Sequence, residues 1–434
     1  MDIKTRKKYY NLCNPYKTLS LASGDVFDID NFKIDNNFIN IRGENWAEKI
    51  AKKIEWAEEP QVVYFTGYPG SGKTTELKRV EAILEDRDYT NLLPVYINAL
   101  EYLPKHESLD EIDIFSTIVY STMLKVSEYL GESNHLENET YFSRLWTWLN
   151  ETDVILKNAE VGKDNTKLVI EMKNNPSFRS RIKSNINAYP SRFKDEVIVE
   201  LTRLNELVKE HAIDGERKSG IVIIFDSLEH NIGIGSEATN VANSIHRLFA
   251  NRDNLLLPID VIYTLPPHLS NRQIGDIEFL PVVRVRNRDN SICSDGVKVM
   301  KNLLYERIPR EDMNTIFGDD ESRLDSLIVY SGGYPRDLLY LVQQVILVDN
   351  YPISNADINT IFQELENKYR DNIPLKYKDE LLKIYKTKEV DFSDTNQVDM
   401  AQTLFSIHVI LRYRNGEQWF SLNPPSLRVL GIEE

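Results

Sequence analysis

The alternation of apolar and polar stretches along the chain predicts an α/β protein. Short runs rich in apolar, β-branched and aromatic residues are typical of buried parallel strands, and five of them occur at 62–66, 92–99, 220–226, 258–265 and 277–285. The stretches between these runs carry apolar residues at helical spacing, as Trp46, Ile50 and Ile54 do in "ENWAEKIAKKIEWAEE". Strands that alternate with helices predict a parallel sheet covered by helices.

The alternation is interrupted once and stops near residue 290. Residues from about 130 to 215 are polar and mostly helical in pattern, and beyond residue 290 the patterns are helical as well. Near the end, Asn415-Gly416 between two apolar-rich runs is a strong signal for a hairpin turn, and a hairpin after helices suggests a winged helix. We therefore expect four regions: an N-terminal arm (1–45), an α/β core (46–290) with the helical insertion, a helical lid (291–365) and a winged-helix-like domain (366–434).

Composition narrows the class of protein. The 434 residues are 41% hydrophobic and 27% charged, which is ordinary for a globular protein, and the formal net charge of −15 argues against non-specific coating of nucleic acid. Two distant cysteines, Cys13 and Cys293, give neither a disulfide framework nor a metal knuckle. No signal peptide and no apolar run of membrane-spanning length is present. These features predict a cytoplasmic protein with no membrane partner.

The stretch "GYPGSGKT", residues 67–74, carries the strongest chemical signal. Its G-x-x-x-x-G-K-[ST] pattern follows a predicted strand and precedes a predicted helix, the context in which such a loop wraps phosphate groups with its backbone N–H groups. Lys73 should reach the β- and γ-phosphates, and the Thr74 hydroxyl should bind Mg²⁺. We predict ATP and Mg²⁺ as cofactors, with the nucleotide bound by Gly67, Pro69, Gly70, Ser71, Gly72, Lys73, Thr74, Thr75, Arg42 and Pro335.

Hydrolysis of a triphosphate needs an acid for the metal and a group that orients water. Asp226 ends a strand of five consecutive apolar residues and is predicted to hold Mg²⁺ with Thr74. Glu229, three residues on, is predicted to orient the attacking water, although Ser227 stands directly after Asp226, where many P-loop ATPases carry their catalytic Glu. Thr264, at the end of the fourth strand, either senses the γ-phosphate or faces solvent.

Arginines further along supply candidate contacts to phosphate. In "GGYPRDLLYL", Gly332 and Gly333 permit a tight entry into a helix and Pro335 suits its first turn. Arg336 would then touch phosphate and Pro335 would pack on adenine if the lid folds over the nucleotide; an exposed arginine is the alternative. An arginine that acts on a neighbouring protomer cannot be chosen among Arg247, Arg252, Arg284, Arg286 and Arg288.

The segment from Lys173 to Lys194 has six basic and no acidic residues, with Phe178, Tyr189 and Phe193 among them. Basic residues interleaved with aromatic ones can form a groove for nucleic acid. A solvated helical face or a surface for an acidic protein fits the same pattern.

Taken in order, "GYPGSGKTTEL", "VIIFDSLEHN", "PIDVIYTLPP" and "GGYPRDLLYL" resemble the AAA+/STAND-related bacterial P-loop ATPases, relatives of the KAP, NACHT and Orc/Cdc6-type ATPases, many of which act in anti-phage defence. The resemblance covers roughly residues 40 to 345. It implies Mg-ATP binding, switching between lid states and assembly into oligomers, and it matches Arg336 to a sensor-2 arginine. STAND proteins usually add a long sensor array and an effector domain, whereas this sequence ends at Glu434, so we expect a separate effector chain.

Three functions follow from these observations. The first is a P-loop ATPase (AAA+-like) that hydrolyses ATP with Lys73, Asp226, Glu229, Thr264 and Arg336 and works as an oligomerising switch on a partner effector. The alternative is a DNA-binding loader or transposition-type regulator that uses the winged helix and the basic segment. A metabolic kinase is the weakest of the three candidates, because such enzymes seldom need a lid followed by a winged helix.

Overall fold

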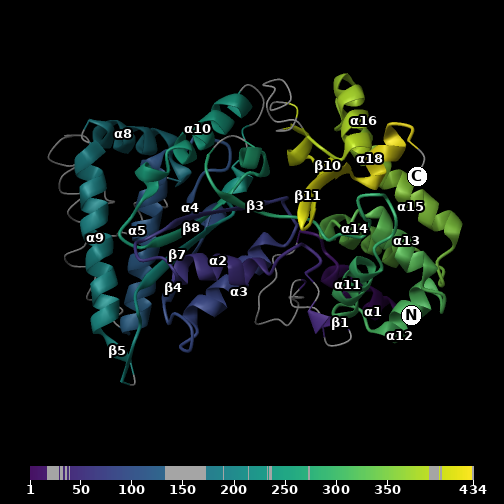
Figure 1. Ribbon diagram of the computed structural model, residues 1–434, viewed down its shortest axis with the longest axis horizontal. Helices are drawn as coiled ribbons and strands as arrows, with labels where there is room; N and C mark the ends of the chain where they lie inside the picture. Colours follow the sequence, from purple (N-terminus) through teal and green to yellow (C-terminus); the bar gives the residue numbers. More distant parts are fainter. Residues whose placement is uncertain are drawn as a thin grey trace.

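The computed structural model describes residues 1–16, 29, 33–34, 37–38, 40–131, 173–188, 190–213, 215–231, 233, 237–271, 274–390, 400 and 403–432. Figure 1 shows an α/β part that contains the sheet and, beside it, a mainly helical part that contains both chain termini. No helix in these residues is both long and apolar enough to cross a membrane.

The central sheet has five parallel strands in the order β4-β7-β8-β3-β9. The strands are β3 (Val62–Gly67), β4 (Leu93–Asn98), β7 (Ile221–Asp226), β8 (Asp260–Leu265) and β9 (Ile277–Leu280). The fourth strand of the chain, β8, lies between β3 and β7, and all five predicted runs form strands. Because every strand runs in the same direction, the segments that follow β3, β7 and β8 meet at one edge of the sheet.

Helices cover both faces of the sheet. On one face, α2 (Trp46–Glu55) and α3 (Lys73–Glu85) pack on Val63 and Phe65 of β3. On the other face, Val62 and Tyr64 share a core with α5 (Glu111–Leu130), α9 (Pro190–Glu210) and α10 (Ala238–Ala250). Alternate side chains of one strand therefore enter two different cores. The predicted fold class, a P-loop NTPase of AAA+-like type, is confirmed.

The insertion contributes α8 (Pro176–Asn187) and α9, which stand against α5 at the outer side of the sheet (Figure 1). Residues 132–172 of the predicted insertion lie outside the described part of the chain. Short elements complete this half: β1 (Lys33–Ile34), β2 (Asn37–Phe38), α4 (Ala99–Tyr102), β5 (Ala212–Ile213), β6 (Glu216–Arg217), η4 (Leu228–His230), η6 (Arg252–Leu255) and η7 (Pro267–Asn271).

The second half of the molecule is built on a single core. It holds the lid helices and the hairpin of two antiparallel strands, with Gly416 at positive φ in its turn. The elements are α11 (Ser294–Tyr305), α12 (Arg310–Phe317), α13 (Ser322–Tyr330), α14 (Pro335–Leu347), α15 (Asn355–Arg370), η8 (Leu375–Tyr377), α16 (Lys378–Thr387), β10 (Ile410–Asn415), β11 (Glu417–Leu422) and α18 (Pro424–Val429). The boundary expected at residue 365 falls inside α15, which packs on α18.

The N-terminal arm begins with helix α1 (Ile3–Leu12), which packs on α14 of the lid and not on the sheet (Figure 1). Arg6 donates to the carbonyl oxygens of Ile346 and Val348 at 2.9 to 3.1 Å, which satisfies carbonyl groups at the C-terminus of α14. The amide of Gln343 on α14 donates to Tyr10 O at 2.8 Å. The start of the chain is thus anchored to the lid.

Candidate functional site

The P-loop connects β3 to α3 and has the backbone that its glycines predict. Gly70 and Gly72 lie at φ 88° and 100°, in the left-handed region that favours glycine. At Gly70 a Cβ atom would come within 2.4 Å of Arg336 Nε, so any larger residue there would displace the arginine side chain. The hydroxyl of Ser71 is buried in the loop and has no hydrogen-bond partner among the described residues.

Lys73 is buried at the start of α3 and lies among acceptors. Its ammonium donates to Gly67 O at 2.9 Å and to Tyr68 O at 3.0 Å, and it forms an ion pair with Glu229 Oε1 at 2.8 Å. Both side chains of the pair are nearly inaccessible, at 3% and 4% exposure. A buried carboxylate thus accompanies the lysine that is predicted to bind phosphate, and an incoming phosphate would compete with it for the same ammonium.

Asp226, at the end of β7, accepts three hydrogen bonds. Thr74 Oγ1 and Tyr96 OH both donate to its Oδ2, at 2.8 and 2.6 Å, and the backbone N–H of Ser227 donates to Oδ1 at 2.6 Å. Thr74 and Asp226, the two predicted metal ligands, are therefore in direct contact. Tyr96 lies on β4, the neighbouring strand, and its hydroxyl fixes the same carboxylate oxygen that Thr74 contacts.

The two acids differ in their tendency to ionise. Burial, and then the charge of Glu229, raises the pKa of Asp226 above its ordinary value, although Tyr96 and Thr74 oppose this by hydrogen bonding. Burial opposes ionisation of Glu229 too, but the Lys73 ammonium lowers the pKa of Glu229 below its ordinary value. Glu229 is consequently held as a carboxylate, the form that can accept a proton.

Ser227 and Thr264 place Glu229 beside the P-loop. Ser227 has φ 71°, a left-handed conformation that costs a non-glycine residue about 1 kcal/mol. The chain then enters the short turn η4, where Leu228 N donates to Thr264 Oγ1 at 3.1 Å. Thr264 is fully buried, so its hydroxyl holds the turn that carries Glu229 and does not face solvent.

The lid touches the P-loop directly. Tyr334, which precedes the first turn of α14, donates through its hydroxyl to Pro69 O. Pro335 is buried at the first position of the helix, and Arg336 lies over Gly70 with its Nε atom buried and unpartnered among the residues described. Arg336 and Pro335 are thus placed at the loop, whereas their predicted contacts to phosphate and adenine remain predictions.

The winged-helix-like part covers the same loop through aromatic side chains. Tyr68, within the P-loop, is fully buried and stacks on Phe405, with ring centroids 6.0 Å apart. His408 lies 5.9 Å from Tyr68 and stacks on Tyr334 at 4.8 Å. Burial, and then the charges of Arg336 and Lys73, lowers the pKa of His408 to about 3, so this imidazole is neutral.

Arg42 contacts both the P-loop and the helix that follows it. Its guanidinium is fully buried, donates to Ser71 O at 3.3 Å and forms an ion pair with Glu76 of α3 at 2.5 Å. These contacts use protein atoms, so the structure places Arg42 as a support of the loop and its predicted contact to nucleotide stays a prediction. Thr75 lies half-buried in the first turn of α3.

The site has features that suit a nucleotide phosphate and a magnesium ion. Buried donors without partners, Ser71 Oγ and Arg336 Nε, lie at a glycine loop that opens a helix, where anions are favoured. The adjacent oxygens of Thr74 and Asp226 are hard ligands of the kind that Mg²⁺ prefers. No group of three His, Cys, Asp or Glu residues that could hold a metal is found in the described ranges. Phosphates and water would therefore supply the other ligands.

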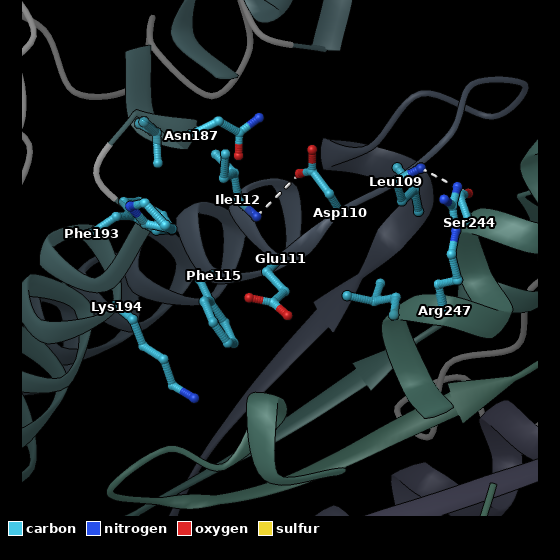
Figure 2. Close-up of a pocket in the computed structure, with 13 residues that line it drawn as sticks. Leu109, Asp110, Glu111, Ile112, Phe115, Asn187, Phe193, Lys194, Ser244 and Arg247 are labelled. Atoms are coloured by element: carbon cyan, nitrogen blue, oxygen red, sulfur yellow. Dashed lines mark hydrogen bonds between the residues drawn. The ribbon is translucent and has the colours of Figure 1, made fainter. Parts of the chain in front are cut away.

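The arginines that were candidates to act on a neighbouring protomer lie in different parts of the molecule. Arg252 donates to Val62 O at the amino end of the sheet, away from the P-loop, and Arg288 pairs with Glu389 and Glu417. Arg247 is exposed on α10 and lines a separate cavity of about 380 Å³ between α5, α9 and α10, drawn in Figure 2. Arg284 and Arg286 lie between β9 and α11.

Two of the six basic residues in the basic segment form ion pairs with carboxylates. Arg179 and Lys183 of α8 both pair with Asp113 of α5, at 2.7 and 2.5 Å. Phe193 is buried in the core and forms part of the wall in Figure 2, so it offers no exposed ring on which a base could stack. Tyr189 and the side chain of Phe178 lie outside the described part of the chain.

Sequence reasoning missed four residues that complete this site: Tyr68, Tyr96, Phe405 and His408. Tyr68 occupies a variable position of the loop motif, and Tyr96 lies inside a strand run. The available signal for Tyr96 was its place in the sequence. It is a polar residue two positions before the end of its strand, and that strand pairs with the strand of Asp226. Phe405 and His408 carried no local signal, because their importance comes from contact with a distant loop.

The sequence matches no protein-family model and no curated protein. Among solved structures, the chain is similar to a chain in the structure of Drosophila ORC bound to DNA, with 10% identity and a TM-score of 0.33 over 89% of this chain and 84% of that one. It is also similar to Cdc6p from Pyrobaculum aerophilum, with 12% identity and a TM-score of 0.34 over 89% of this chain and 92% of that one. Likeness at this level carries no argument about chemistry, which rests here on the geometry described above.

Proposed function

We propose that this protein is a Mg-ATP-binding and hydrolysing switch of AAA+/STAND-like type, in which the nucleotide controls how the lid and the winged-helix-like part sit on the P-loop. The observation that carries the proposal is the direct contact of Tyr334 and Arg336 with Pro69 and Gly70. A group that binds in the loop must meet these side chains, so a change in the nucleotide changes the lid contact.

The chemistry is assigned to residues already in contact. The loop amides, Lys73 and Arg336 bind the phosphates, and Thr74 and Asp226 hold the magnesium ion, which supplies positive charge next to the phosphates. Glu229, which is a carboxylate beside Lys73 before nucleotide binds, accepts the proton of the attacking water. Pairing with Glu229 holds Lys73 at the mouth of the loop until phosphate replaces the carboxylate.

The switch acts, in this proposal, by forming a homo-oligomer in the cytoplasm and by regulating a separate effector protein, with anti-phage defence as the setting. The support is the resemblance of the four motifs to defence ATPases together with the closed contact between lid, winged helix and P-loop. A DNA-binding role has less support, since Arg412 lies over Phe279 at 4.2 Å and Arg414 pairs with Glu44, so that two hairpin arginines contact the α/β core.

Two measurements test the proposal. ATP turnover by the full chain, compared with the Lys73→Ala variant, tests the site, and light-scattering mass with ADP and with ATP tests assembly. We expect turnover that depends on Lys73 and a mass that rises with ATP. A protein that neither binds nor hydrolyses ATP would disprove the site, and a mass independent of nucleotide would disprove switching by assembly.

A further inference from the structure

The N-terminal arm stays attached to the lid beyond its first helix. Helix α1 packs on α14, and Cys13, which follows the helix, is fully buried in the core of the second half of the molecule. The hydroxyl of Tyr9 also donates to Asp312 of α12. The chain up to Cys13 is therefore held on the lid, and the residues that follow Cys13 start from a fixed point.

The sequence "NPY", residues 14–16, forms a tight turn directly after this anchored part. Asn14 Oδ1 accepts from Tyr16 N at 2.9 Å, so the asparagine side chain takes the place of a backbone carbonyl in the turn. Pro15 lies between these two residues and has a fixed backbone dihedral φ. The position of Tyr16 relative to Cys13 is consequently set by local backbone geometry.

Tyr16 lies against the guanidinium group of Arg336. Arg336 Cζ is 5.3 Å from the centroid of the ring, within the distance at which a cation is attracted to an aromatic face. In the part of the chain that the structure describes, the ring makes no other aromatic contact and its hydroxyl has no hydrogen-bond partner. Because the residue is 78% exposed, burial contributes little to holding the ring in this place.

The structure shows few other contacts that could hold Arg336 at the P-loop. No ion pair joins Arg336 to a carboxylate among the described residues, and Glu229, the acid at the loop, pairs with Lys73. Arg336 and Lys73 are both cations at this loop, and like charges repel each other. An aromatic ring attracts the guanidinium but, unlike a carboxylate, adds no negative charge that would repel a phosphate.

We propose that Tyr16 is a positioning residue that holds the Arg336 guanidinium over the P-loop, so that the N-terminal arm forms part of the phosphate site. The inference rests on the proposed function, in which Arg336 binds phosphate. It extends that function to residues that the family resemblance, which begins near residue 40, does not cover. A side chain that is already in place loses less conformational freedom when it binds, and this raises affinity.

Two substitutions in the full chain test the aromatic contact. Tyr16→Leu removes the aromatic face and keeps an apolar side chain, whereas Tyr16→Phe keeps the aromatic face and removes only the hydroxyl. Tyr10→Leu is the matched control, because Tyr10 is another exposed tyrosine of the same arm. Tyr16→Leu and Tyr10→Leu are each combined with Arg336→Ala as well, which gives double-mutant cycles.

Two quantities are measured for these proteins. The first is the affinity for a fluorescent ATP analogue. The second, which needs no nucleotide, is the rate at which phenylglyoxal modifies Arg336, followed by mass spectrometry of the peptide that contains it. In Tyr16→Leu we expect affinity to fall by about three- to tenfold, as loss of a cation–π contact predicts, and Arg336 to be modified faster.

Tyr16→Phe and Tyr10→Leu should match wild type in both quantities, and Tyr16→Leu should change the affinity no further once Arg336→Ala is present. Wild-type affinity and a wild-type modification rate in Tyr16→Leu would overturn the inference, as would a loss of affinity that persists with Arg336→Ala. ATP turnover that depends on Lys73 would then leave the proposed function standing. A wild-type protein that binds no ATP overturns the proposed function, and the modification rates alone then decide whether Tyr16 holds Arg336.

Discussion

On one side of the P-loop, Lys73 and Thr74 contact Glu229 and Asp226; on the other, Tyr68 packs against Phe405 and His408. The first side is charged, and each of its contacts can be replaced by a phosphate or a magnesium ion. The second side is aromatic and stabilised by burial, which no ligand replaces atom by atom. The difference indicates that the loop binds nucleotide with one side and holds the C-terminal half of the molecule with the other.

Lys73→Ala should have the largest effect. It removes the only side-chain ammonium among the described loop residues and leaves Glu229 buried without its cation. We expect ATP affinity to fall by more than about 100-fold, in line with the cost of a lost buried charge contact, and hydrolysis to disappear. Equilibrium binding of a fluorescent ATP analogue measures this, and unchanged binding would show that the charged side does not hold the nucleotide.

Glu229→Gln should separate binding from hydrolysis. Glutamine keeps the shape but cannot take a proton, so hydrolysis should fall by about 10²–10⁴-fold. ATP affinity should stay or rise, since a negative charge that competes for Lys73 is gone. Single-turnover kinetics tests this, with Asn205→Leu as the control, since Asn205 accepts from Ile221 N at 2.8 Å at the other end of β7. Normal hydrolysis would mean that another acid accepts the proton.

Tyr68→Ala should weaken the aromatic contact between the P-loop and the C-terminal half of the molecule. Nucleotide binding on the charged side should remain. Loss of a fully buried ring costs about 3 kcal/mol or more in a core, and here it should loosen the winged-helix-like part from the P-loop. Tyr64→Ala is the control, because that ring packs on Phe249 and Tyr263 within the α/β core. Limited proteolysis should cut Tyr68→Ala, but not the control, in the C-terminal half; identical cutting would argue against a separable aromatic side.

His408 should make the stability of the protein depend on pH below neutrality. Its pKa is about 3 in the folded protein and about 6.5 when exposed, so the unfolded or undocked state binds more protons between these values. Stability should therefore fall as the pH drops from 6.5 towards 3, by about 1.4 kcal/mol per pH unit from this group. Thermal melts of wild type and His408→Phe against pH would show this slope only in wild type; equal slopes would assign it to other groups.

The sheet and the charged side could be predicted from sequence because their signals are local. Five apolar runs end at one edge of the sheet, and Lys73, Thr74 and Asp226 stand at fixed places in or next to those runs. Such contacts follow from strand direction alone. The position of Glu229 could not be predicted from strand direction alone, since this residue reaches Lys73 only through the left-handed turn at Ser227.

The aromatic side could not be predicted, because it joins segments far apart in the chain. Gly333 illustrates this: its sequence context predicts a tight turn, but the structure shows that a Cβ there would lie 1.7 Å from Val283 O, where the lid crosses the segment after β9. Arg42 was predicted to bind nucleotide, and the structure adds contacts that sequence could not predict: its buried guanidinium contacts Glu76 and Ser71 O.

The central claim is that nucleotide on the charged side moves the aromatic side. Spin labels at Glu59→Cys, an exposed site of the α/β core, and Glu417→Cys, at the exposed hairpin, report the distance between the two halves. We expect one distance distribution with ADP, a longer distance with a non-hydrolysable ATP analogue, and no change between the two nucleotides when Lys73→Ala is added. An unchanged distribution in wild type saturated with the analogue would contradict it.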